Sequence, residues 1–192
     1  MRAAEEKQIR GMYVMGENPM LSDPNIGHVE TAIRALDFLV VQDIFLSETA
    51  ELAHVILPAT ASLEKEGTFT NTERRVQLFA PVLPAPGLAR DDWRVVAELG
   101  QRLAAKLGQT TVRWQYGSTA EVMAELAASA PIYGGMSYDR LPGKGLTWPC
   151  PTAEHPGTPI LHTTQFSRGL GMFKVINAQI QAEEPNAEYP LI

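Results

Sequence analysis

Residues 39–58 have the sequence Leu39-Val-Val-Gln-Asp-Ile-Phe-Leu-Ser-Glu-Thr-Ala-Glu-Leu-Ala-His-Val-Ile-Leu-Pro58. Two apolar runs, 39–41 and 54–57, flank a polar stretch in which Ser47 is a helix-capping residue type. The runs are rich in Val, Ile and Leu, as buried strands are, and Pro58 ends the second because proline cannot extend a strand ladder. This stretch predicts a strand, a short helix and a second strand.

The same plan occurs upstream. Residues 9–15 form an apolar run that ends at Gly16 and predicts a strand followed by a turn. Asp23, followed by a proline, has the pattern of a helix start, and apolar residues at helical spacing continue to Phe38. Three strands joined by crossovers of this length indicate parallel pairing with right-handed connections. We therefore predict an α/β fold with a Rossmann-like parallel sheet flanked by helices.

The middle of the chain predicts a long loop and two helices. Residues 60–82 are polar and contain a glycine, which predicts a loop with one short extended piece at 76–79. Helices are predicted at 93–107 and 118–130, the second beginning with a Ser-x-x-Glu capping box. One face of the first of these helices carries the large apolar side chains Trp93, Val96, Leu99, Leu103 and Leu107.

The C-terminal part has a different composition. Eleven of the thirty residues 131–160 are Gly or Pro, which disfavours regular structure. We therefore expect two parts, an α/β domain over 1–130 and a long irregular Gly/Pro-rich segment over 131–192 that wraps over a surface. Residues 188–192 resemble the start of a strand, which suggests that a further domain follows.

Composition excludes several classes of function. The chain has 192 residues, 45% hydrophobic and 20% charged, with a net charge of -6. An acidic balance disfavours a general polyanion surface, so we predict no nucleic-acid partner. No stretch approaches the ~20 apolar residues of a membrane span, and the first residues lack the apolar core of a secretion signal. We expect no membrane span and a cytoplasmic location.

Metal and redox chemistry have few candidate ligands in this sequence. Cys150 is the only cysteine, so the sequence offers no internal disulfide, no thiolate zinc site and no ligand set for an iron–sulfur cluster. The four histidines have no metal-ligand spacing and are predicted to be structural or exposed. We predict no catalytic residue and no metal ligand here.

Polar residues occur where the predicted strands end. In an alternating strand–helix chain these positions meet at one rim of the sheet, where nucleotide-like ligands bind. Four polar clusters lie at such positions, over residues 16–19, 42–43, 64–67 and 91–92.

Simpler interpretations exist for each candidate. The turn containing Gly16 has the composition of any surface turn, and a lone aspartate such as Asp43 is commonly a helix cap or loop hydrogen-bonder. Either Asp91 or Asp92 must cap the following helix, and we assign the cap to Asp91, which leaves Asp92 for a ligand. Lys65 lies between two glutamates and has the pattern of a solvated loop charge.

Four stretches, residues 12–19, 40–50, 55–59 and 64–77, have motifs that occur together in one enzyme family. Together they resemble the large (alpha) subunit of molybdenum- or tungsten-dependent formate dehydrogenases, within the molybdopterin oxidoreductase family. Residues 148–151 and 155–158 favour a formate dehydrogenase over another member of that family.

The resemblance implies a cofactor and a set of contacts. In the whole enzyme the cofactor would be bis-molybdopterin guanine dinucleotide carrying Mo or W, and this α/β domain would bind one of its two pyranopterin guanine dinucleotides. The contacts would fall on Asn18, Gln42, Asp43, Lys65 and Asp92, with Gly16 allowing close backbone approach.

The resemblance also implies what lies outside this sequence. The family's metal ligand and cluster-binding cysteines lie in more N-terminal parts, so the iron–sulfur cluster is expected there, and this chain alone is predicted to be inactive. Its partners would be the remaining domains of the large subunit and electron-transfer subunits. Two alternatives are the same domain of a molybdopterin nitrate reductase and a non-catalytic electron-transfer scaffold related to NADH dehydrogenase.

Overall fold

The computed structural model describes residues 1–109, 111–177, 185–188 and 190. The chain divides into two compact units, residues 1–159 and 160–192. The second unit contains a single bridge, between Phe166 and Gly169, and no helix or strand among its described residues. The strand start predicted for 188–192 involves residues outside the described ranges.

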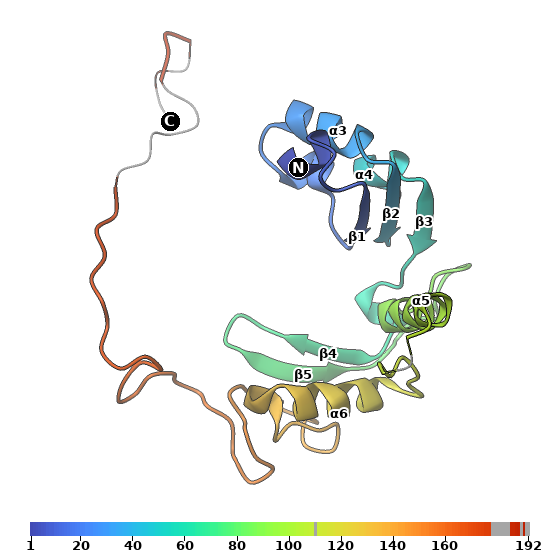
Figure 1. Cartoon of the computed structure of the whole chain (residues 1–192). Helices are drawn as coiled ribbons and strands as arrows, with labels where there is room; N and C mark the ends of the chain where they lie inside the picture. Colours follow the sequence, from blue (N-terminus) through green and yellow to red (C-terminus); the bar gives the residue numbers. More distant parts are fainter. Residues whose placement is uncertain (110, 178–184, 189, 191–192) are drawn as a thin grey trace. The chain divides into compact units, whose positions relative to one another are not determined.

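The first unit contains the predicted parallel sheet. Its strands are β1 (Gly11–Met15), β2 (Phe38–Asp43) and β3 (Val55–Pro58), in that order and parallel throughout. This confirms the predicted α/β architecture. Figure 1 shows helices beside the strands, and the helices of this part are α1 (Arg2–Glu5), α2 (Pro19–Ser22), α3 (Ile26–Arg34) and α4 (Glu48–Glu51).

One face of this sheet forms the N-terminal core. Val14, Leu39 and Val41 alternate with residues of the other face, and they pack with apolar side chains of the helices. The helix side chains in this core are Ala4 of α1, Val29, Ala32 and Ile33 of α3, and Ala50 of α4. The other face carries Tyr13, Met15, Phe38 and Val55, which are 37–50% exposed. Helices α1, α3 and α4 therefore cover one side of the sheet, and the other side is only partly covered.

Helix α3 begins later than predicted. Its cap is Asn25 rather than Asp23, and the Asn25 side chain accepts a hydrogen bond from the backbone N–H of His28 at 3.3 Å. Asn25 has a left-handed backbone with φ 61°, which asparagine tolerates better than most residues. Asp23 is the extended residue that ends α2, a short helix the sequence pattern did not predict.

The prediction of a long loop over residues 60–82 is wrong. They contain the 3-10 helix η1 (Ser62–Glu64) and an antiparallel hairpin of β4 (Gly67–Thr70) and β5 (Arg75–Phe79). The extended piece predicted at 76–79 is confirmed as part of β5. A third strand, β6 (Leu146–Thr147), pairs with β5. The hairpin is local, with four residues between its strands, and it was missed because the polar residues of β4 and of the turn have the composition of a loop.

Both predicted long helices are present. They are α5 (Asp92–Leu107) and α6 (Thr119–Ser129). Gly108 ends α5 with φ 65°, the left-handed conformation that glycine adopts readily. The Ser118 side chain caps α6 by accepting from the backbone N–H of Glu121 at 3.2 Å. The helix start and stop signals in the sequence were therefore sufficient here.

The large apolar face of α5 is not its most buried side. Val95, Ala97 and Gly100 are buried, and Gly100 lies against the Trp114 ring so closely that a Cβ would be 2.3 Å from it. By contrast, four residues of the predicted apolar face, Val96, Leu99, Leu103 and Leu107, are 37–69% exposed. Helix α5 thus packs through small residues and presents large ones outward.

The Gly/Pro-rich segment forms part of a second core. Met136, Leu141 and Cys150 pack with Val76 of β5 and Met123 of α6. Over residues 131–159 the regular elements are short, namely β6 and the 3-10 helix η2 (Pro131–Tyr133). The segment is irregular as predicted, and residues on both sides of position 130 contribute to one core.

Candidate functional site

A cavity of about 220 Å³ lies at the carboxyl ends of β1 and β2. It is bounded by the ends of both strands, the chain around η1 and the first residue of α5. Five of the six predicted site residues line it, which are Gly16, Gln42, Asp43, Lys65 and Asp92. The remaining lining residues are Ile44, Ala59, Thr60, Ala61, Ser62 and Phe69. The parallel strands therefore bring these polar side chains to one rim.

Gly16 turns the chain at the end of β1. It has φ +63°, and its backbone N–H donates to the Gln42 carbonyl oxygen at 2.9 Å. A Cβ built at this position would have no atom within 4 Å. The glycine is therefore favoured for its backbone conformation and not for lack of space.

Replacing Gly16 by alanine should lower the free energy of unfolding by about 1 kcal/mol, because an L-residue is strained at positive φ. Asparagine tolerates this conformation, so Gly16→Asn should recover most of that loss. Urea denaturation followed by circular dichroism measures both. Equal stability of the alanine variant and the unmodified chain would contradict the conformational explanation.

Asn18 is set apart from the other five predicted residues. Its Nδ2 donates to Glu48 Oε2 at 2.6 Å, and its Oδ1 accepts from the Thr49 N–H at 3.3 Å and from Thr49 Oγ1 at 2.7 Å. The pKa of Glu48 is lowered by its own backbone N–H and then by Asn18. Asn18 thus ties the start of α2 to α4 and does not line the cavity.

A chain of polar contacts crosses the cavity wall. The Tyr13 hydroxyl donates to Gln42 Oε1, and Gln42 Nε2 donates to Asp92 Oδ1 at 2.6 Å. The other carboxylate oxygen of Asp92 accepts from the Lys65 ammonium group. Gln42 is fully buried, whereas the side chains of Lys65 and Asp92 are 20% and 33% exposed. Lys65 and Asp92, predicted as separate ligand contacts, are therefore partners of each other.

Tyr13 was missed by sequence reasoning, although a signal for it exists. Strand β1 alternates, so Tyr13 lies on the opposite face from Val14, the face that Gln42 occupies on β2. A strict period-two assignment of both strands would have placed the two side chains together.

Asp43 is the second carboxylate that lines the cavity, beside Asp92. One of its oxygens, Oδ1, accepts from the backbone N–H of Ile44 at 2.6 Å and of Phe45 at 3.5 Å, which shapes the turn after β2. Among the described residues no ion pair involves Asp43. The second oxygen, Oδ2, has no hydrogen-bond partner among the described residues.

Asp91 precedes α5 as predicted, but its carboxylate does not cap the helix. The side chain accepts from Thr60 Oγ1 at 3.2 Å and lies 3.5 Å from the Arg94 guanidinium. Asp91 therefore connects α5 to the chain that follows β3. This contact helps to fix the neighbouring Asp92 at the cavity.

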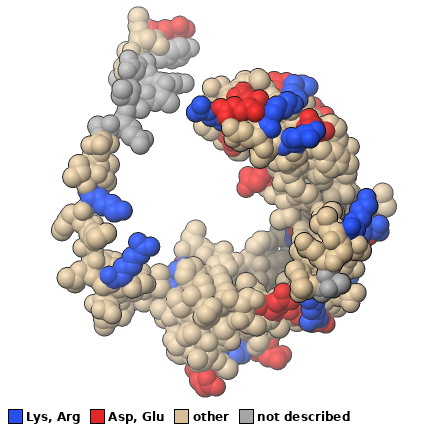
Figure 2. All heavy atoms as spheres, viewed as in Figure 1, with Lys and Arg blue, Asp and Glu red and all other residues tan. Residues whose placement is uncertain are grey.

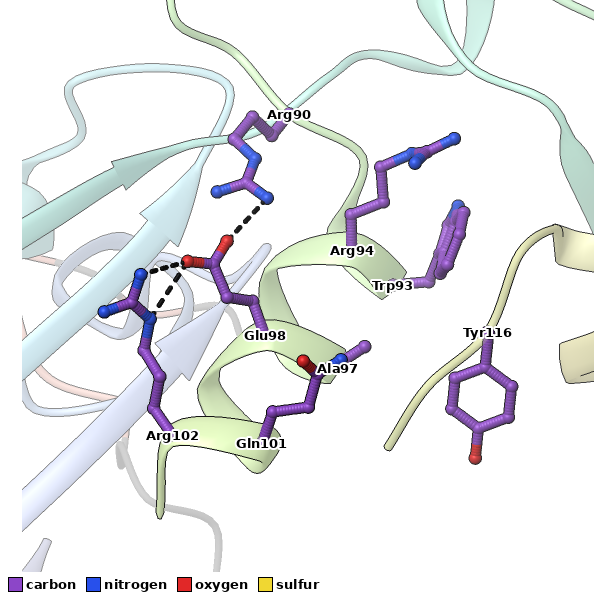
Figure 3. Close-up of a pocket in the computed structure, with 8 residues that line it drawn as sticks. All are labelled: Arg90, Trp93, Arg94, Ala97, Glu98, Gln101, Arg102 and Tyr116. Atoms are coloured by element: carbon purple, nitrogen blue, oxygen red, sulfur yellow. Dashed lines mark hydrogen bonds and ion pairs between the residues drawn. The ribbon is translucent and has the colours of Figure 1, made fainter. Parts of the chain in front are cut away.

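A second hollow, of about 490 Å³, lies along the outer face of α5 (Figure 3). Glu98 lies between Arg90 and Arg102, at 2.8 and 2.6 Å. Hydrogen bonds from Arg102 and then Arg90 lower the pKa of Glu98. Arg94 stacks 4.5 Å from the centroid of the Trp93 ring. Glu98 thus offsets the charge of two of the three arginines in this hollow.

Three further observations concern the surface charge, the candidate metal ligands and the helices of the described residues. Figure 2 shows acidic and basic side chains side by side over the N-terminal helices. Among the described residues no group of three or more His, Cys, Asp or Glu side chains is arranged to hold a metal ion. Within the same ranges, none of the helices has the length and apolar character needed to cross a bilayer.

Comparison with known proteins places the chain in a family. A family model described as Molybdopterin oxidoreductase matches residues 1–102, which include every residue of the rim cavity. The chain belongs to the molybdopterin oxidoreductase family. The matched region ends within α5, shortly after Asp92 supplies the last of the polar groups described above. The family resemblance predicted from the motifs is confirmed.

The most similar relatives include formate dehydrogenase subunits. The F420-dependent formate dehydrogenase 2 subunit alpha of Methanococcus maripaludis is 47% identical over 97% of this molybdopterin oxidoreductase chain and 27% of its own length. The F420-dependent formate dehydrogenase subunit alpha of Methanocaldococcus jannaschii is 46% identical with the same coverage. The assimilatory nitrate reductase catalytic subunit of Bacillus subtilis is 39% identical over the whole chain and 28% of its own length. The chain spans about a quarter of these relatives.

A solved structure supports the fold alone. Acetylene hydratase from Pelobacter acetylenicus superposes with a TM-score of 0.54 over 68% of this chain and 17% of its own, at 19% sequence identity. At that identity the similarity concerns the α/β architecture. It agrees with the parallel sheet and flanking helices of the first unit.

Proposed function

We propose that the rim cavity binds the guanosine end of a pyranopterin guanine dinucleotide, within the large subunit of a formate dehydrogenase. The observation that carries this proposal is the convergence of Gly16, Gln42, Asp43, Lys65 and Asp92 on one cavity at the carboxyl ends of parallel strands. Family membership and the 46–47% identity to formate dehydrogenase alpha subunits support it.

The donor and acceptor chemistry of the cavity fits a guanine nucleotide. Asp43 offers a carboxylate to the adjacent N–H donors of a guanine edge. The Lys65 ammonium has three donors, of which Asp92 engages one, so two remain for a phosphate oxygen. At about 220 Å³ the cavity is below the ~300–1,000 Å³ of sites for drug-sized ligands. It therefore suits one end of a dinucleotide rather than the whole molecule.

The role proposed for this chain is to hold and orient the cofactor. When bound, bis-molybdopterin guanine dinucleotide with its Mo or W ion supplies the two-electron chemistry by which formate becomes CO2. We propose that the metal and iron–sulfur ligands belong to other parts of the large subunit, that electron-transfer subunits are partners, and that the enzyme is cytoplasmic. On this proposal the isolated chain catalyses no formate-dependent dye reduction.

A nitrate reductase is the second candidate, since a nitrate reductase catalytic subunit is among the relatives. Its 39% identity is below the 46–47% of the formate dehydrogenase subunits, which favours the first proposal. Both candidates assign the same nucleotide-binding role to the rim cavity.

GMP should bind the purified chain with a Kd of about 1 mM or below, and Asp43→Asn should weaken that binding by about 10–100-fold. The asparagine amide keeps one acceptor but turns a donor toward the donors of the guanine edge. Isothermal titration calorimetry measures both affinities. AMP, which lacks that pair of N–H donors, should bind more weakly than GMP.

The matched control is Asp37→Asn. Asp37 immediately precedes β2 and is the counterpart of Asp43 at the opposite end of that strand, where it pairs with Arg10 and Lys7. This variant should bind GMP as the unmodified chain does. A folded chain that shows no saturable binding up to about 10 mM GMP would overturn the proposed function.

A further inference from the structure

We propose that Tyr13 is a positioning residue of the candidate site: its hydroxyl sets the orientation of the Gln42 side-chain amide and, through that amide, the position of the Asp92 carboxylate. Tyr13 lies on β1 and is not among the residues that line the rim cavity. The inference rests on the proposed nucleotide-binding function and adds a residue that contacts no ligand.

The hydrogen-bonding capacity of Asp92 determines which group donates in each contact between Asp92, Gln42 and Tyr13. Asp92 is paired with the Lys65 ammonium group, so its carboxylate is an acceptor only. Gln42 must then present its NH2 group to Asp92, which the 2.6 Å contact satisfies. Its carbonyl oxygen consequently faces the other way, and only a donor satisfies it. The Tyr13 hydroxyl is that donor.

Burial makes this arrangement restrictive. Gln42 is fully buried, so neither end of its amide has water as an alternative partner. A rotated amide would place the carbonyl oxygen against the Asp92 carboxylate and the NH2 group against the tyrosine. The contacts of Tyr13 and Lys65 therefore select one orientation of Gln42 and one position of Asp92.

The protonation of Tyr13 is consistent with a donor role. Burial, and then the negative charge of Asp92, raise the pKa of the Tyr13 hydroxyl above its ordinary value. The folded chain thus keeps the proton on this hydroxyl throughout the neutral and mildly alkaline range. The hydroxyl remains able to donate to Gln42 wherever nucleotide binding would be measured.

Tyr13→Phe tests the inference, because it keeps the ring and removes only the donor. We expect GMP binding to weaken by about 3–10-fold. In a Gln42→Leu background the same change should have no further effect, since the group it positions is gone. Tyr138→Phe is the matched control. Tyr138 is also partly buried with a raised pKa, but it packs against the second core.

The result that would overturn the inference is GMP binding by Tyr13→Phe as tight as that of the unmodified chain. An equally large loss in the Gln42→Leu background would also overturn it, because Tyr13 would then act independently of Gln42. Either result leaves the proposed nucleotide site intact as long as the unmodified chain binds GMP.

A measurement without nucleotide separates the two proposals. Hydrogen exchange of the Gln42 side-chain amide, followed by NMR, should be at least about 10-fold faster in Tyr13→Phe and unchanged in Tyr138→Phe. Faster exchange in a chain that binds no GMP would refute the nucleotide function and uphold the positioning of Gln42. Unchanged exchange and unchanged GMP affinity would refute the positioning alone.

Discussion

Replacing Leu39 by alanine should lower the free energy of unfolding by about 2–5 kcal/mol. Leu39 lies on β2, the central strand of the sheet, is 1% exposed and belongs to the core cluster that contains Val29 and Ile33 of α3. Truncation removes apolar contacts and leaves a cavity that a parallel sheet cannot readily close. Urea denaturation followed by far-ultraviolet circular dichroism measures the change.

Leu88→Ala makes the same chemical change at a position that is 85% exposed. It should alter the free energy of unfolding by no more than about 0.5 kcal/mol. Equal denaturation midpoints for the two variants would show that the core around Leu39 is not the one described.

Arg140→Met should lower the free energy of unfolding of the second core by about 2–4 kcal/mol. The Arg140 guanidinium donates to three backbone carbonyls, those of Gly135, Thr152 at 3.3 Å and His155 at 2.8 Å. Hydrogen bonds from a charged donor contribute about 1.5–3 kcal/mol each, and their losses are not additive. Methionine keeps the apolar stem but leaves those carbonyls without this donor.

The reactivity of the Cys150 thiol measures this loss of stability. It is the only cysteine of the chain, is fully buried, and its Sγ lies 3.6 Å from Arg140 Nη1. The rate of its modification by a thiol reagent should rise by at least about 10-fold in Arg140→Met, because opening of this segment exposes the thiol. Arg102→Met, on the exposed face of α5, is the control and should leave the rate unchanged. A slow rate in both variants would contradict the role given to Arg140.

The N-terminal sheet was predictable because its signals are local. The apolar runs at 9–15, 39–41 and 54–57 are short and separated by crossover-length segments, which together allow few arrangements. The capping residue of α6 and the glycine after α5 are signals of the same local kind. The start of α3 was misplaced because Asp23 and Asn25 are both good caps, and the preceding helix α2 decided between them.

Most of the features that the sequence did not predict involve contacts between distant segments. The β4–β5 hairpin is local and was missed for its polar composition, whereas its pairing with β6 involves a Gly/Pro-rich stretch with little strand character of its own. The rim location of Lys65 and Asp92 was predicted, but their pairing with each other was not. Asn18 was grouped with them by its position after β1, and its engagement by α4 became visible only with the folded chain.

The partly covered second face of the parallel sheet affects how the polypeptide behaves in water. Parallel sheets are ordinarily shielded on both sides, and here Tyr13, Met15, Phe38 and Val55 remain accessible on the face opposite α1, α3 and α4. Exposed apolar surface of this kind favours reversible self-association as concentration rises. Sedimentation velocity at the concentrations used for calorimetry and NMR therefore establishes whether the polypeptide is monomeric in those measurements.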